Sequence, residues 1–161
     1  MKSFSYLFLF LLFSVSAWAQ NKPEAVSFKK MAKEKSLDLH AKYPKVADVE
    51  FKSCKNVTER HDKVDKIWHD LWHNFTEYYH QKGLVFKGKR KLFVHLHFSE
   101  EGHLDYFGYH FKKKENEQTH QFVALFKEFV ENYKFDLAEG AKFSQCGELH
   151  LIPRKGVKER L

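Results

Sequence analysis

The strongest pattern in the chain is an apolar stripe at helical spacing between Thr58 and Gly83. Its members are Val64, Ile67, Trp68, Leu71, Trp72, Phe75, Tyr78 and Tyr79. At about 100° per residue these side chains share one broad face of a helix. Thr58 is the expected N-cap, and Gly83 is the expected terminator. The pattern therefore predicts an amphipathic helix whose opposite face carries Asp65, His69 and His73.

Period-two alternation follows this helix and is typical of a strand with one buried face. Leu92, Val94, Leu96 and Phe98 point one way, and Phe93, His95 and His97 point the other way. The stretch 99–102 then forms a turn in which Gly102 takes the position that requires positive φ. On this register we expect Phe98 to pair with Leu104 in a β-hairpin.

The second strand of the hairpin departs from strict alternation. Its heavy apolar residues are Leu104, Phe107, Tyr109 and Phe111, a step of three followed by two steps of two. One extra residue restores the facing of the side chains. We therefore predict a β-bulge near Asp105 and Tyr106.

Two further elements complete the predicted fold. An apolar face predicts a helix from about Thr119 to Tyr133, with Thr119 as its cap, and the stretch "CGELHLIP" predicts a final strand that Pro153 ends. The order helix, hairpin, helix, strand predicts an α+β domain over residues 49–153. In this domain two amphipathic helices pack on one face of a small antiparallel sheet, which consists of the hairpin plus the C-terminal strand.

The segments outside this domain are less patterned. Residues 20–48 are rich in lysine, and Ala25, Phe28, Met31 and Ala32 predict a short helix there. We expect residues 154–161 to form a loose basic tail.

The first 19 residues have the features of a secretory signal peptide. A lysine precedes a Leu- and Phe-rich run, and Ala17-Trp18-Ala19 has the small-x-small form of a cleavage site. The strictly apolar centre is short for a membrane-spanning helix, and no later stretch is apolar enough. We expect cleavage, which leaves a periplasmic or secreted protein with no transmembrane segment; the alternative is that the segment is retained as a membrane anchor.

The net charge of +7 bears on the class of partner. In a secreted protein such a charge favours a membrane surface, a glycan or an acidic protein over nucleic acid. The hairpin is expected to bring Lys89–Lys91 beside Lys112–Lys114. This basic cluster could hold a carboxylate-rich peptide or an anionic head group, although a charged rim that keeps the sheet end soluble is the ordinary explanation.

Two sets of histidines are candidate metal ligands. His95 and His97 lie on one strand with Asp105 opposite His97, which resembles half of a zinc site. His69 and His73, at i and i+4 on the first helix, form a second pair. The alternative is that these histidines are ordinary polar residues on wet faces, because spacing fixes no further ligand. Zinc is thus the alternative to a protein without a cofactor.

Cysteine and motif content limit the chemistry further. Cys54 and Cys146 could form a disulfide in an oxidising compartment, or remain free. The chain contains no Gly-x-Ser-x-Gly elbow, no Gly-rich phosphate loop and no His-Glu-x-x-His motif. We therefore expect a protein that is not an enzyme.

The block from Lys91 to Pro153 resembles the C-terminal domain of the TonB family. The resemblance rests on a strand that ends in an acidic turn with glycine, apolar residues spaced three, two and two, an amphipathic helix, an aromatic-led connection at 135–138 and the final "LHLIP". Upstream, "VEFKSCKN" and the first helix look like the segment that precedes this domain in secreted TonB-like proteins of Bacteroidetes-type bacteria. The resemblance covers residues 49–153.

The resemblance implies a mode of binding. Domains of this family offer a sheet edge to an extended peptide of an outer-membrane receptor, and backbone hydrogen bonds supply the affinity. The edge here is expected to comprise Glu148, Leu149, His150, Leu151 and Ile152. Alternatively, a second copy of the chain could cover this edge in a homodimer.

Two departures from the family limit what is expected. The aromatic-led connection has Leu137-Ala138 where the family commonly has Pro-Ala. The chain contains three prolines, whereas energy transducers of this family carry a long proline-rich spacer. The resemblance thus implies a non-catalytic periplasmic module that binds an envelope protein. The alternative is a secreted protein that binds a divalent metal through histidines.

Overall fold

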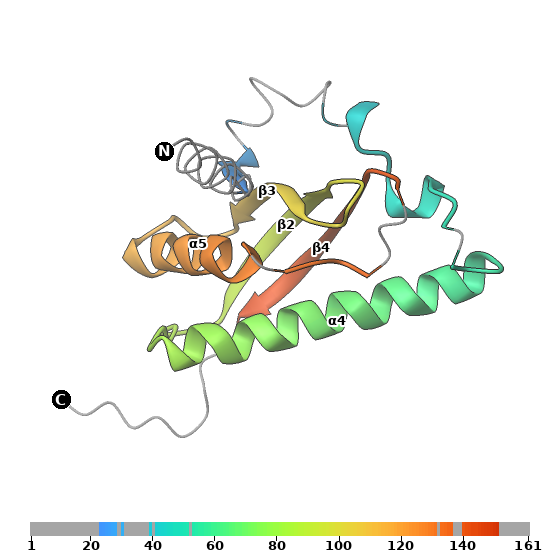
Figure 1. Cartoon of the computed structure of the whole chain (residues 1–161). Coiled ribbons are helices and arrows are strands. Elements are labelled where there is room, and N and C mark those ends of the chain that lie inside the picture. Colours follow the sequence, from blue (N-terminus) through green and yellow to red (C-terminus); the bar gives the residue numbers. More distant parts are fainter. Residues whose placement is uncertain are drawn as a thin grey trace, which may run out of the picture.

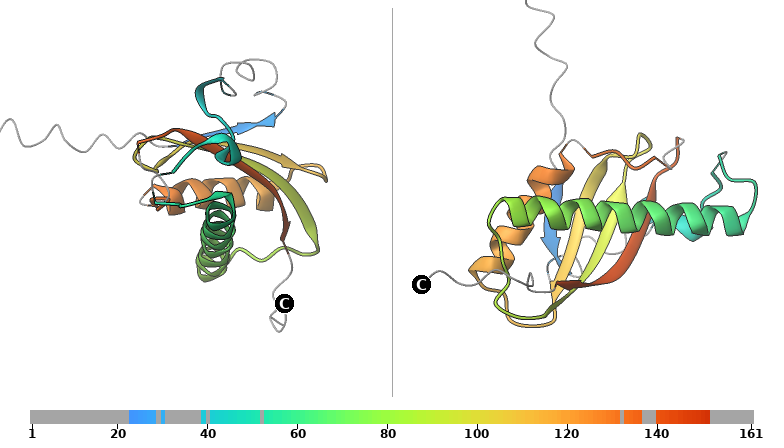
Figure 2. Two further views of the ribbon diagram at one scale, coloured as in Figure 1. Left: turned by 90° about the vertical axis from the view of Figure 1, so that its right-hand side faces the viewer. Right: turned by 90° about the horizontal axis from the view of Figure 1, so that it is seen from below.

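The computed structural model describes residues 23–28, 30, 39, 41–51, 53–131, 133–136 and 140–151. Its elements are β1 (Glu24–Ser27), the 3-10 turn η1 (Val46–Asp48), α4 (Val57–Gln81), β2 (Arg90–Phe98), β3 (Leu104–Phe111), α5 (Glu117–Val130) and β4 (Phe143–Leu151). The four strands form one sheet in the order β1-β3-β2-β4. Both helices lie on the same face of this sheet (Figures 1 and 2). The predicted α+β class is confirmed.

Helix α4 begins two residues earlier than predicted. Its N-cap is Asn56, whose Oδ1 accepts a hydrogen bond from the N–H of Glu59 at 2.9 Å, so Thr58 lies inside the first turn. Asparagine competes well for this position because its short side chain reaches back to the first free amides. At the other end Gly83 takes a φ of 82°. The N–H of Leu84 then reaches the carbonyl of Tyr79 at 3.0 Å, which closes the helix as predicted.

Helix α5 also begins earlier and ends earlier than predicted. Asn116 is the N-cap, and Thr119 is the third residue of a capping box rather than the cap itself. The N–H of Asn116 donates to Thr119 Oγ1 at 2.7 Å, and Asn116 Oδ1 accepts from the N–H of Thr119 at 3.1 Å. The helix ends at Val130, so Tyr133 lies beyond it.

The hairpin has the predicted register. Phe98 pairs with Leu104, whereas the preceding residue, His97, pairs with Tyr106. Asp105 is therefore the extra residue of a β-bulge, as the spacing predicted. Gly102 has a φ of 84°, which a residue with a Cβ rarely adopts.

The predicted N-terminal helix through Ala25 and Phe28 is wrong in its first part. Residues 24–27 form β1, which pairs in parallel with β3 and places Ala25 beside Phe107. The free edge of β3 supplies the hydrogen bonds for this strand, and a parallel partner so distant in sequence leaves no local signal. Met31 and Ala32 lie outside the described residues, as do the signal peptide, Ile152, Pro153 and the tail.

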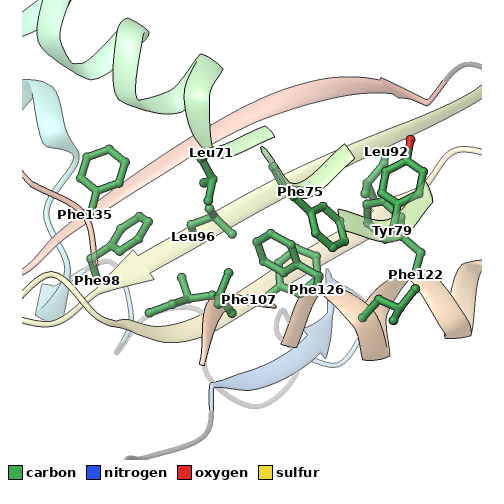
Figure 3. Packing of buried hydrophobic residues seen from close by; sticks show 14 of the residues in the cluster. Leu71, Phe75, Tyr79, Leu92, Leu96, Phe98, Phe107, Phe122, Phe126 and Phe135 are labelled. Carbon is green, nitrogen blue, oxygen red and sulfur yellow. The ribbon is translucent and has the colours of Figure 1, made fainter. Parts of the chain in front are cut away.

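An aromatic cluster fills the space between the helices and the sheet (Figure 3). Phe75 of α4 is completely buried, and its ring centroid lies 5.1 Å from that of Phe122 and 4.9 Å from that of Phe126. Phe126 in turn lies 4.4 Å from Phe107 of β3. These rings hold both helices to the sheet, because large buried aromatics contribute most of the apolar area removed from water.

Residues 41–51, which we call the strap, wrap around the edge of β4. Tyr43 packs on the face of the sheet away from the helices, with its ring 5.2 Å from His97 and 5.9 Å from Tyr106. Lys45 forms a parallel bridge with Ser144 at the edge. Phe51 then reaches the helix-covered face, where its ring lies 5.5 Å from that of Phe143. The strap, teal in Figure 2, thus passes from one face to the other.

Leu71→Ala should lower the free energy of unfolding by about 2–5 kcal/mol, because the side chain is 1% exposed and its removal leaves a cavity. His69→Ala should change it very little, because His69 is exposed on the opposite face of α4. Urea unfolding of both variants measures the difference. Equal losses in the two variants would show that α4 faces the sheet differently.

Candidate functional site

Strand β4 lies at one edge of the sheet. The backbone N–H and C=O groups of its residues point alternately toward β2 and away from the sheet. Lys112 N–H donates a hydrogen bond to Lys91 O at 3.0 Å. The backbone N–H and C=O groups of odd-numbered β2 residues therefore point toward β3, and those of even-numbered residues point toward β4. The pairs Leu92–Leu149 and Val94–Gly147 are consequently the hydrogen-bonded ones. The intervening residues of β4 must direct their N–H and C=O groups away from the sheet.

The strap occupies only the first of these outward positions. Ser144 N–H donates to the carbonyl of Pro44 at 2.7 Å, and Ser144 Oγ lies 3.2 Å from the carbonyl of Tyr43. The outward positions that follow are Cys146, Glu148 and His150. Within the described part of the chain, their backbone groups form no hydrogen bond. We call this stretch, residues 146–150, the open edge.

The open edge overlaps the predicted partner-binding residues only in part. Glu148 and His150 direct their backbone outward, whereas Leu149 and Leu151 use theirs to pair with β2. Ile152 lies outside the described residues. Cys146 was not among the predicted residues, although the alternation of buried and exposed residues along "CGELHL" places it with Glu148 and His150.

On the helix-covered face, the open edge lies against Trp68 of α4. A Cβ placed on Gly147 would be 3.0 Å from Cζ2 of the Trp68 indole, so a larger residue there would require the indole to shift. Ile67 and Leu149 are partly buried beside the same core. These three side chains form an apolar surface beside the edge strand, which we call the apolar ledge. The apolar stripe predicted from the sequence did not show that Trp68 reaches the sheet edge.

The other face of the open edge is charged. Glu148 Oε1 lies 2.7 Å from Lys91 Nζ and 2.6 Å from His150 Nε2. These two hydrogen bonds, that from Lys91 first, lower the pKa of the Glu148 carboxyl to about 2. Charged side chains on an edge strand discourage unselected pairing with other chains.

The predicted zinc half-site does not assemble as expected. His97 was expected on a wet face, but it is 1% exposed because Tyr43 of the strap covers it. Asp105 Oδ2 accepts a hydrogen bond from the Tyr43 hydroxyl at 2.7 Å, and burial, with this bond, raises the pKa of Tyr43. The rings of His95 and His97 are 4.2 Å apart.

The second histidine pair is exposed. The rings of His69 and His73 stack with centroids 6.3 Å apart on the solvent side of α4, and Asp65 is exposed on the same side. Among the described residues, no group of three or more His, Cys, Asp and Glu side chains is placed to hold a metal ion.

Of the two alternatives for Cys54 and Cys146, the structure has the unbridged one, and both cysteines are free thiols. Cys54 packs against the core between the sheet and the helices. The side chain of Cys146 lies on the same face of β4 as those of Ser144 and Glu148. This is the face of the sheet away from the helices. The sheet therefore separates the two sulfur atoms, which spacing along the sequence could not reveal.

Thiol titration of the unfolded, unreduced protein should find two reactive thiols. In the folded protein Cys146 should react quickly because it is exposed. Cys146→Ser should remove this fast reaction and leave one thiol. A chain without free thiols would contradict the placement of both cysteines.

In Lys91→Gln the pKa of Glu148 should rise toward its ordinary value, as measured by NMR titration of the carboxyl carbon. Because the folded-state pKa is lowered, the stabilisation from this ion pair is present above the ordinary pKa and is lost as the pH falls toward about 2. Added salt should weaken it, since the group is exposed. An unchanged titration in Lys91→Gln would contradict the assigned cause.

Within the described residues, no helix is long and apolar enough to cross a membrane. Comparison of the chain with protein-family models, with curated proteins and with solved structures gives no match.

Proposed function

We propose that this chain is a non-catalytic protein-interaction module that binds an extended peptide by adding it as a strand to the open edge of β4. One observation carries the proposal. Cys146, Glu148 and His150 present backbone donors and acceptors outward at a sheet edge, and the strap stops short of them. Such groups are the recognition element of β-augmentation.

The faces of the open edge define the side chains of the bound peptide. Successive side chains of an added strand point to opposite faces of the sheet. On the helix-covered face they lie beside Trp68 and Leu149, which favours apolar residues at every second position. On the other face they lie beside the Lys91–Glu148–His150 group, which favours polar residues. The expected ligand is a short segment of alternating apolar and polar residues.

The sequence supports a cellular setting for this proposal. The leader-like first 19 residues and the resemblance to the TonB C-terminal domain support a periplasmic or secreted module. Its partner in this proposal is a protein of the cell envelope, such as an exposed peptide of an outer-membrane receptor. A second copy of the chain that pairs β4 with β4 is the competing occupant of the same edge.

Replacing Glu148 with proline should abolish peptide binding and leave the fold intact, because proline removes an outward N–H that β2 does not use. The probe is a heptapeptide library displayed on phage and selected on the purified protein, followed by affinity measurement on the enriched synthetic peptides. In the complex, the amides of Cys146, Glu148 and His150 should gain protection from hydrogen exchange.

Two matched variants complete this test. Glu148→Ala removes the carboxylate but keeps the N–H, so it should retain binding. Leu149→Pro removes an N–H that pairs with β2, so it should destabilise the fold. Enriched peptides that bind Glu148→Pro as tightly as the natural chain, or protection that appears elsewhere, would refute the edge proposal. A dimer in sedimentation that Glu148→Pro dissociates would instead assign the edge to a second copy.

A further inference from the structure

Five basic residues meet at the end of the sheet away from the hairpin turn. They are Lys89, Arg90, Lys112, Lys113 and Lys114, and we call them the basic end. The hydrogen bond from Lys112 N–H to Lys91 O, at 3.0 Å, joins the two segments that carry them. The loops before β2 and after β3 run from this same end in Figure 2.

The charges of the basic end have no ion-pair partner within the described part of the chain. The nearby cation Lys91 differs, because it contacts Glu148 at 2.7 Å. Five positive charges without acidic partners at one end of a small domain produce a strong local positive potential.

An exposed phenyl ring lies beside the basic end. Phe93 of β2 is 40% exposed, and the only other exposed large hydrophobic residue among those described is Val57, near the start of α4. Phe93 pairs across the hairpin with His110, and its ring contacts that of Phe28 at 5.7 Å. Lys112 follows His110 by two residues, so alternation places it on the same sheet face as Phe93.

We propose that the basic end and Phe93 together form a docking surface for an anionic phospholipid membrane. Lysines near an anionic bilayer are attracted to its surface potential, and an adjacent aromatic ring gains by entering the region between head groups and acyl chains. A lipid surface offers anionic head groups and an apolar layer together, whereas an acidic polypeptide must place an apolar side chain at the one position opposite Phe93. The combination of charges with an exposed Phe93 therefore favours a lipid surface.

This surface borders the open edge, because Phe93 pairs with Glu148 across β2 and β4, but the two surfaces use different groups. The open edge uses outward backbone groups of β4, whereas the docking surface uses side chains of β2, β3 and the loops beside them. Variants at Glu148 and variants at Lys113 and Lys114 therefore test peptide binding and membrane binding through different groups.

Co-sedimentation with vesicles tests the proposal. The full chain should bind vesicles of equimolar phosphatidylcholine and phosphatidylglycerol, and should not bind vesicles of phosphatidylcholine alone. Because each lysine near an anionic surface contributes about fivefold to binding, Lys113→Gln with Lys114→Gln should weaken it roughly 25-fold. Phe93→Ala should weaken it roughly tenfold.

A matched double variant controls for net charge. Lys55→Gln with Lys134→Gln removes the same charge outside the basic end and should change vesicle binding by less than about threefold. Circular dichroism should confirm that each variant is folded. Equal binding to both vesicle types, an equal loss in the control double variant, or an unaffected Phe93→Ala would overturn the proposal. Binding to polyglutamate without binding to the anionic vesicles would assign the basic end to an acidic protein instead.

Discussion

The burial of Phe75 between the two helices and the sheet is the interaction on which the rest of the structure depends. Its ring lies within 5.4 Å of those of Tyr79, Phe122, Phe126 and Phe129. These rings come from both helices, so one side chain fixes how α4 and α5 pack against each other. Large aromatic rings tolerate few alternative arrangements at interior packing density, and this fixes the orientation of α4.

The orientation of α4 in turn determines the chemistry at the sheet edge. Because the helix crosses under β4, Trp68 reaches the edge strand, and the absence of a side chain at Gly147 allows the contact. The strap passes around the same strand and takes the outward hydrogen bonds at Ser144. What remains between the strap and the end of β4 is a short open edge. The strap therefore sets the length of the open edge, and α4 supplies its apolar ledge.

The open edge and the basic end differ in whether their charged side chains form ion pairs. At the open edge, Glu148 is held by Lys91 and His150, so the positive charge of Lys91 is compensated locally. At the basic end, the lysines that follow β3 have no such partner in the described part of the chain. The two proposed surfaces are therefore neighbours on one sheet, one built on backbone groups of β4 and the other on the side chains of the basic end.

The sequence by itself determined the elements whose signals are local. The stripe around Phe75 predicted α4, and the step of three after Leu104 predicted the bulge at Asp105, because periodicity and register are properties of neighbouring residues. The start of α4 was displaced by two residues because Asn56 competes with Thr58 as a cap, and that of α5 by three because Asn116 takes the cap position in place of Thr119. Tertiary structure alone decided what depends on distant segments: the parallel pairing of β1, the burial of His97 under Tyr43, the separation of the two cysteines by the sheet, and which backbone groups of β4 stay open. These contacts join residues far apart in the chain, and no local pattern encodes which surface a distant segment will cover.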